Sequence, residues 1–285
     1  MKATQAHVPR KKPKLGQHFL IDPAAAMQIV EALGDLSQST VLEIGPGRGA
    51  LTSLLARRAR RVIAVETDRV LAAQLRMKFS LTPNLEIIEG DILAVDFHTL
   101  FGPKPGSMRP GLEETVEPVR VIGNLPYFLT SDILLRLFEY RKYFETIVLM
   151  VQKEVADRLA AEPGSRDYGL LTVTAQLFAS VERLFTLSPG AFSPPPQVYS
   201  SILRLRIAPK AQSLGVDSQE FLDFCKLAFA QKRKTLFNNL RRRHEDIEIK
   251  EILRSAGVRE DVRAEALSLH KLAEIYKLWH TSPRL

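Results

Sequence analysis

Short apolar runs alternate with longer stretches of mixed polarity between residues 40 and 152. The runs are rich in Val, Ile and Leu and are nearly continuous, which is typical of strands buried on both faces of a parallel sheet. The stretches between them have helical composition. Repeated strand–helix units predict a doubly wound, mostly parallel α/β sheet. The predicted strands are 40–44, 61–66, 85–89, 119–122 and 146–152, and the helices 50–60, 69–79, 131–140 and 153–161.

The pattern changes in the second half of the chain. Two β-like runs, 181–187 and 199–207, flank a Pro-rich segment, and this short separation predicts an antiparallel pair at the edge of the sheet. Beyond residue 209 the segments 220–240, 247–256 and 268–280 are helical. The sequence therefore predicts a main domain over 15–209 and a small all-helical C-terminal domain over 210–285. Residues 1–14 are predicted to be a mobile basic tail, and 101–118 an irregular surface loop.

Basic residues are concentrated in two places. The chain of 285 residues carries a net charge of +8, yet residues 1–20 and 226–243 together hold twelve basic residues and no acidic one, which leaves −4 for the rest. Two basic patches on a mildly acidic body suggest a polyanionic partner. A solvated basic face and a disordered tail would give the same pattern. The residues expected to contact the phosphates of such a partner, on helices, are Lys232, Arg233, Lys234, Arg241, Arg242 and Arg243.

A single cysteine, Cys225, excludes a disulfide framework and a multi-cysteine metal site, and is compatible with a reducing compartment. We therefore expect a cytoplasmic protein. The histidines are scattered without the spacing of metal ligands, so no metal is expected. The longest apolar stretches, such as 147–151, are far shorter than a membrane span.

A glycine-rich loop follows the first predicted strand. Gly45 and Gly47 permit a tight turn and a close approach of the backbone to a ligand before the next helix. Glu66 ends the second strand, about 20 residues later, where a carboxylate can accept hydrogen bonds from ribose hydroxyls. Asp91 follows the third strand. The loop and its acids predict a nucleoside-binding site, although a structural turn with surface carboxylates would look similar.

The cofactor is ambiguous from the loop alone, because Gly45, Gly47 and Ala50 also fit the dinucleotide fingerprint G-x-G-x-x-G/A. Two features favour S-adenosyl-L-methionine over NAD. Glu43 stands two residues before the first glycine, and acids end three successive units. A cofactor with an amino group, a ribose and an adenine amine can use such acids, whereas they would repel a pyrophosphate.

A tetrapeptide that suits an exocyclic adenine nitrogen follows the fourth strand. At the carboxyl end of a strand, Asn124, Leu125, Pro126 and Tyr127 lie in the ligand crevice of an open α/β sheet. The Asn124 side-chain oxygen and the Leu125 carbonyl can accept the two N–H groups and so turn the nitrogen lone pair toward a methyl donor. Pro126 would fix the backbone and Tyr127 would stack on the base. Catalysis would then consist of positioning and electrostatics.

From Lys14 to about Tyr276, the chain resembles the KsgA/RsmA family of ribosomal RNA adenine N6,N6-dimethyltransferases. The matching segments are 14–20, 43–49, 90–91, 124–127, 152–155, 192–200 and 229–239. The resemblance implies a Rossmann-like class I methyltransferase sheet. It also implies catalytic roles for the 124–127 tetrapeptide and for Phe192, which is expected to stack on the flipped adenine. Its expected cofactor-binding residues are Gln17, His18, Leu20, Glu43, Gly45, Gly47, Glu66, Asp91 and Asn124.

The family resemblance implies dimethylation, with S-adenosyl-L-methionine, of two adjacent adenosines near the 3′ end of 16S rRNA during small-subunit biogenesis. A monomer acting on a small-subunit precursor is expected. His18 stands where asparagine is common, and the 101–118 loop looks longer than usual. The alternatives are a large-subunit methyltransferase of the macrolide-resistance type, a non-catalytic RNA-binding assembly or transcription factor, and a nicotinamide dehydrogenase.

Overall fold

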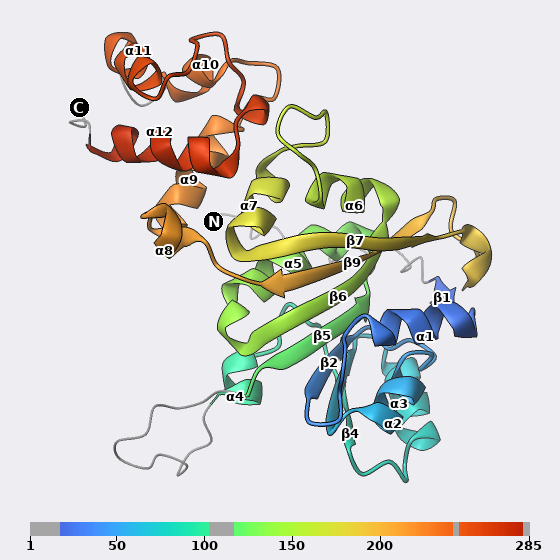
Figure 1. The fold of residues 1–285 in the computed structure, drawn as a ribbon. Coiled ribbons are helices and arrows are strands. Elements are labelled where there is room, and N and C mark those ends of the chain that lie inside the picture. The colour runs from blue at the N-terminus through green and yellow to red at the C-terminus, as the bar shows by residue number, and fades with distance from the viewer. Residues whose placement is uncertain (1–17, 103–116, 242–244, 282–285) are drawn as a thin grey trace, which may run out of the picture.

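A computed structural model describes residues 18–102, 117–241 and 245–281. A seven-stranded sheet in the order β4-β3-β2-β5-β6-β9-β7 forms its centre (Figure 1). The chain moves outward from β2 through β3 to β4 and then returns to place β5 on the other side of β2. This reversal creates a crevice at the carboxyl ends of β2 and β5, where open α/β sheets bind ligands.

The five parallel strands agree with the predicted runs, except that β5 continues to Asn124 and β6 begins at Phe144. Helices follow the strands and cover both faces of the sheet (Figure 1). Asp68 caps α3 by accepting hydrogen bonds from two backbone amides, which explains where that helix begins. These elements are β2 (Thr40–Ile44), α2 (Thr52–Arg58), β3 (Arg61–Glu66), α3 (Arg69–Lys78), β4 (Leu85–Glu89), α4 (Phe97–Phe101), β5 (Val119–Asn124), α5 (Thr130–Glu139), β6 (Phe144–Gln152) and α6 (Lys153–Leu159).

The expected antiparallel edge is confirmed. Strand β9 (Ser200–Ile207) pairs antiparallel with β6, and β7 (Ala179–Leu187) pairs antiparallel with β9. Helix α7 (Leu170–Phe178) precedes β7 and was not predicted. A further ribbon joins distant parts of the chain, since β1 (Phe19–Leu20) pairs with β8 (Phe192–Ser193). Helix α1 (Pro23–Glu31), which was also not predicted, follows β1.

The C-terminal segment is helical as predicted, but the expected helix over 220–240 is interrupted. It forms α9 (Ser218–Ala228), a turn and the short helix α10 (Leu236–Leu240). Helices α8 (Ala211–Leu214), α11 (Asp246–Ser255) and α12 (Leu269–Thr281) complete the group, which gathers beside α7 at one end of the molecule (Figure 1). Short 3-10 turns lie at Tyr127–Leu129, Arg141–Tyr143, Pro189–Ala191 and Ala264–Ala266.

A single buried cluster runs from the sheet into these C-terminal helices. It contains Leu203 and Leu205 of β9 together with Phe221, Phe224 and Trp279. Helix α7 contacts both α9 and α12 and so links the two parts. The domain boundary at residue 209 stays a prediction. Within the described part of the chain, no helix combines the length and apolarity needed to cross a membrane.

Candidate active site

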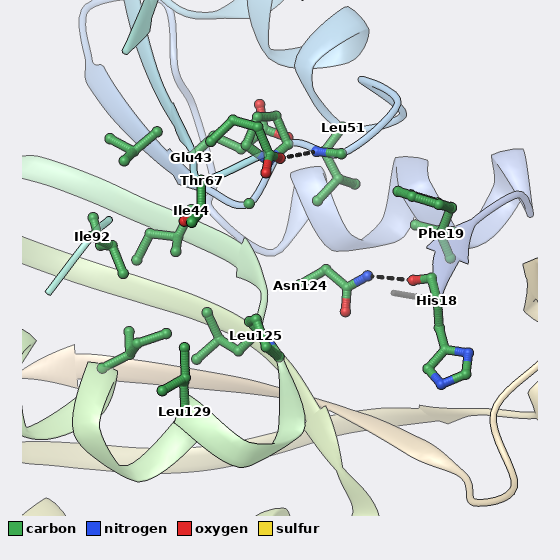
Figure 2. Close-up of a pocket in the computed structure, with 18 of the residues that line it drawn as sticks. His18, Phe19, Glu43, Ile44, Leu51, Thr67, Ile92, Asn124, Leu125 and Leu129 are labelled. Carbon is green, nitrogen blue, oxygen red and sulfur yellow. Dashed lines mark hydrogen bonds between the residues drawn. The ribbon is translucent and has the colours of Figure 1, made fainter. Parts of the chain in front are cut away.

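A cavity of about 340 Å³ opens at the carboxyl ends of β2, β3 and β5. Its walls come from the glycine loop, from the residues after β3 and β4, and from the tetrapeptide after β5. The segment around β1 closes one side (Figure 2). The cavity therefore occupies the crevice that the strand order predicts. Of the expected site residues it is lined by His18, Leu20, Glu43, Gly45, Gly47, Glu66, Asp91, Asn124, Leu125, Pro126 and Tyr127.

The glycine loop holds the Glu66 carboxylate in place. The backbone N–H of Gly47 donates to one Glu66 oxygen at 2.9 Å, and the Asp68 N–H donates to the other at 2.9 Å. Gly47 has a φ of +57°, and a Cβ there would lie 3.0 Å from the ring of Phe19. A side chain at this position would be strained and crowded. Glycine therefore keeps the loop close enough to fix Glu66 at the cavity wall.

Glu43 is the most deeply buried acid of the cavity. Its side chain is 1% exposed, and its Oε2 has no hydrogen-bond partner among the described residues. Burial raises the pKa of Glu43 to about 7, against a smaller opposing effect of the neighbouring Thr52, and the negative charge of Glu66 adds to the rise. Asp91 lines the same cavity and is exposed. This arrangement suits a ligand that carries a positive charge and hydroxyl groups.

Asn124 is oriented by a contact that spans 106 positions of sequence. Its Nδ2 donates to the backbone carbonyl of His18 at 2.9 Å. The donor end of the amide is therefore occupied, and the Oδ1 acceptor is turned away from His18 (Figure 2). The next residue, Leu125, is 1% exposed, and its N–H donates to the carbonyl of Met150 on β6. The Asn124 Oδ1, which the sequence predicted to accept from the target amine, is therefore held in a defined orientation.

The His18 ring lies on the Tyr127 side of the cavity and points away from Glu43 (Figure 2). It stacks on the Tyr127 ring with centroids 5.8 Å apart and an interplanar angle of 27°. The His18 Nδ1 lies 2.8 Å from the carbonyl oxygen of Pro194, and the Tyr127 hydroxyl lies 3.2 Å from the Ser200 hydroxyl. These contacts join the β1 segment and the Pro-rich segment to the tetrapeptide.

One expected site residue is described by the structure but is not brought to the cavity wall. Phe192 is 3% exposed, pairs with Leu20 in the β1–β8 ribbon and packs in a core cluster, so its ring does not line the cavity. Its stacking on a base stays a prediction. Gln17 lies outside the described residues.

The basic residues near the C-terminal helices are placed differently from the prediction. Lys232, Arg233 and Lys234 lie in the exposed turn between α9 and α10, and were expected on a helix. The Lys232 ammonium donates to the carbonyl of Arg166 at 2.7 Å. Arg241 follows α10 and is exposed, whereas the expected contacts Arg242 and Arg243 lie outside the described residues.

Sequence reasoning missed several cavity residues. Arg48 lies within the glycine loop, with its guanidinium 4.4 Å above the ring of Phe19. Phe128 follows the tetrapeptide and also lines the cavity. Both residues stand next to or within recognised motifs, and this adjacency was the sequence signal that could have identified them as cavity residues. No group of three or more His, Cys, Asp or Glu side chains suited to a metal occurs among the described residues.

Comparison with known proteins assigns the chain to a family. The family model of the ribosomal RNA adenine dimethylase matches residues 8–280. The chain belongs to the ribosomal RNA adenine dimethylase family. It is therefore a ribosomal RNA methyltransferase, and the predicted family, enzyme class and Rossmann-like fold are confirmed.

Relatives of this dimethylase-family chain match it over almost its whole length. It is 56% identical over 276 residues to the ribosomal RNA small subunit methyltransferase A of Koribacter versatilis, covering 97% of both chains. It is 54% identical over 269 residues to the protein of that name from Acidobacterium capsulatum, covering 94% of this chain and 91% of the relative.

Solved structures with the same fold also cover most of the dimethylase-family chain. A dimethyladenosine transferase from Plasmodium falciparum is 25% identical, with a TM-score of 0.73, over 92% of this chain and 98% of that one. The 23S rRNA methyltransferase ErmE is 28% identical, with a TM-score of 0.69, over 92% of this chain and 100% of that one.

Proposed function

We propose that this enzyme transfers methyl groups from S-adenosyl-L-methionine to N6 of two adjacent adenosines near the 3′ end of 16S rRNA, and dimethylates each. The orientation of Asn124 carries the proposal, because its Oδ1 is presented beside an acid-lined cavity while its Nδ2 is held by His18. The relatives that are 56% and 54% identical are named for the RNA of the small subunit, whereas ErmE, which is 28% identical, is named for 23S rRNA. The higher identity to the small-subunit enzymes supports 16S rRNA as the substrate.

The residues of the cavity fit the proposed cofactor. Glu66 and Asp91 would accept hydrogen bonds from the ribose and from the adenine amine, and Gly45, Gly47, His18 and Leu20 line the same cavity. The Glu43 Oε2, which has no hydrogen-bond partner in the described ranges, offers a buried acceptor for a charged amino group. When bound, the cofactor supplies an electrophilic methyl on a sulfonium. The same acids disfavour NAD, because its negatively charged pyrophosphate would be repelled by them.

The chain contributes positioning to the reaction. The Asn124 Oδ1 and the Leu125 carbonyl oxygen accept hydrogen bonds from the two N6–H groups of the adenine, which aims the nitrogen lone pair at the methyl group. Tyr127 stacks on the base, and its own position is held by Ser200. As the N–C bond forms and the bond between the methyl carbon and the sulfonium sulfur breaks, N6 would become cationic. The two carbonyl-type oxygens would stabilise that charge until N6 releases a proton to solvent. A monomethylated N6 keeps one N–H and can enter again.

The basic turn is proposed to bind rRNA phosphates. Lys232, Arg233, Lys234 and Arg241 would orient the small-subunit precursor without reading its sequence. The target adenosine is then extruded into the cavity, and aromatic stacking compensates for the stacking lost in the RNA. We propose that the monomer is the working unit and that it acts in the cytoplasm, where small subunits are assembled.

Asn124→Ala tests the function. Loss of one positioning acceptor is expected to lower kcat by about 100-fold or more, since such groups act mainly in the transition state. Mass spectrometry of 16S rRNA from a deletion strain should show both adenosines unmethylated. Wild-type protein should restore dimethylation, and Asn124→Ala should not.

Gln74→Ala removes an exposed amide from α3 and is the matched control, which is expected to restore dimethylation fully. Calorimetric titration separates the cofactors, because S-adenosyl-L-methionine should bind wild-type protein and NAD should not. Dimethylated adenosines in the deletion strain, or an active Asn124→Ala variant, would contradict the proposal.

A further inference from the structure

Phe128 is a large apolar side chain exposed at the mouth of the cavity. It is 60% exposed, although the residues on either side of it, Tyr127 and Leu129, are half-buried. It lines the same cavity as the tetrapeptide. The reaction proposed above uses Tyr127 for the target base and leaves Phe128 without a role.

The backbone that carries Phe128 is firmly held. The N–H of Leu129 donates to the Pro126 carbonyl at 3.0 Å, and the Thr130 hydroxyl donates to the same oxygen at 3.3 Å. Thr130 is 1% exposed and begins α5, whose Ile133 is buried in the core. The aromatic ring is therefore presented from a rigid turn, which keeps the entropic cost of ordering it low.

When the target base is extruded, the base of the neighbouring nucleotide loses its stacking partner and has one face unstacked. Bases stack on exposed aromatic rings in RNA-binding proteins, and this contact tolerates any base. Because Phe128 follows Tyr127 in the chain and lines the same cavity, a nucleotide beside a target base stacked on Tyr127 would come close to the exposed Phe128 ring. Arg48 is an exposed residue that also lines the cavity, and its positive charge suits a polyanionic ligand better than a purely apolar one.

We propose that Phe128 is a stacking platform for the base of the nucleotide next to the target adenosine. The inference rests on the proposed function and deepens it. With two adjacent adenosines as substrate, one adenine occupies the cavity while the other is held outside it on Phe128. Phe128 would thus favour RNA in which a second base is available beside the target.

The first test compares Phe128→Ala, Phe128→Leu and Phe128→Trp on small ribosomal subunits from the deletion strain. Removing the ring is expected to lower kcat/KM about tenfold, mainly through KM, because one base–aromatic stack is lost. Leucine should not restore it, since it keeps apolarity without a ring, and tryptophan should. Calorimetry should show an unchanged affinity for S-adenosyl-L-methionine in all three variants.

The second test needs no methyl transfer. Fluorescence anisotropy would measure binding of an RNA hairpin with two adjacent adenosines, and of hairpins in which the nucleotide 5′ or 3′ of the target is abasic. Wild-type protein should lose about tenfold in affinity with one of the abasic hairpins. Phe128→Ala should bind the intact hairpin and that abasic hairpin equally and weakly, because the ring and the base act as a pair.

Met77→Ala is the control, since Met77 is 79% exposed on α3 and does not line the cavity. It is expected to behave as wild type in both tests. Equal losses for wild type and Phe128→Ala on the abasic hairpin, or a Phe128→Leu variant with full kcat/KM, would overturn the stacking role. A wild-type enzyme that methylates no adenosine would instead refute the proposed function.

Discussion

Burial raises the pKa of Glu43 from 4.5 to about 7, so the folded protein holds this proton more tightly than the unfolded chain does. The free energy of unfolding should therefore fall as the pH rises from about 4.5 to 7, by about 3 kcal/mol if this group acts alone. Glu43→Gln is expected to remove that dependence and to flatten the stability profile. Urea unfolding at a series of pH values between 4 and 8 would measure it.

Glu154→Gln is the control for this residue, because Glu154 is exposed on α6 and its substitution should leave the profile unchanged. An unaltered slope in Glu43→Gln would show that Glu43 ionises without penalty. The same burial favours a cationic ligand, since a positive charge beside Glu43 would lower its pKa again. Calorimetry in buffers of different ionisation enthalpy should therefore detect proton release when the cofactor binds near pH 7.

The turn between α9 and α10 is the element that decides how the basic patch is presented. Its residues Arg233 and Lys234 are exposed, and no regular helix fixes their direction. If each cation neutralises one phosphate, Arg233→Ala and Lys234→Ala should each reduce the slope of log affinity against log salt by about 0.7–0.9. Filter binding or anisotropy with small-subunit RNA between 50 and 300 mM salt would give the slopes.

Lys226→Ala provides the matched control on α9, because the Lys226 ammonium is already paired with Asp223 at 2.8 Å. Its slope should equal that of wild type. If Arg233→Ala and Lys234→Ala also keep the wild-type slope, the turn does not contact phosphates, and its basic side chains are solvated surface residues.

At the scale of the whole molecule, one large buried cluster is shared between the sheet and the C-terminal helices. Phe221 is fully buried at this junction, where its ring stacks against that of Phe224 and meets that of Tyr276 edge to face. Phe221→Ala is expected to lower the free energy of unfolding by about 3–5 kcal/mol, because a large cavity forms in packed surroundings. Trp279 is the single tryptophan of the chain and reports on the C-terminal helices by fluorescence.

Far-UV circular dichroism follows the whole fold, so the two signals can be compared in one urea titration. They should change together in wild type and in Phe221→Ala if the shared core makes unfolding cooperative. A tryptophan transition at lower urea than the dichroism transition would instead show that the C-terminal helices unfold on their own. Phe128→Ala removes an exposed ring and is expected to leave both transitions in place.

Sequence alone determined the parallel sheet and the acid-lined glycine loop, because buried parallel strands are apolar throughout and a tight turn needs glycine. It also placed Asn124 at the end of a strand. It did not reveal α7, whose run of apolar and β-branched residues fits a strand as well as a helix. Nor did it reveal the break after α9, where no Gly or Pro marks the end.

Tertiary structure decided the remaining features through contacts between distant residues. The Asn239 amide satisfies the Ala228 carbonyl at the end of α9, and Thr235 caps α10, so the helix ends without a helix-breaking residue. The His18 carbonyl selects which end of the Asn124 amide faces the cavity. Local patterns encode elements and their order, whereas the direction of a side chain depends on partners that only the folded chain brings within hydrogen-bond distance.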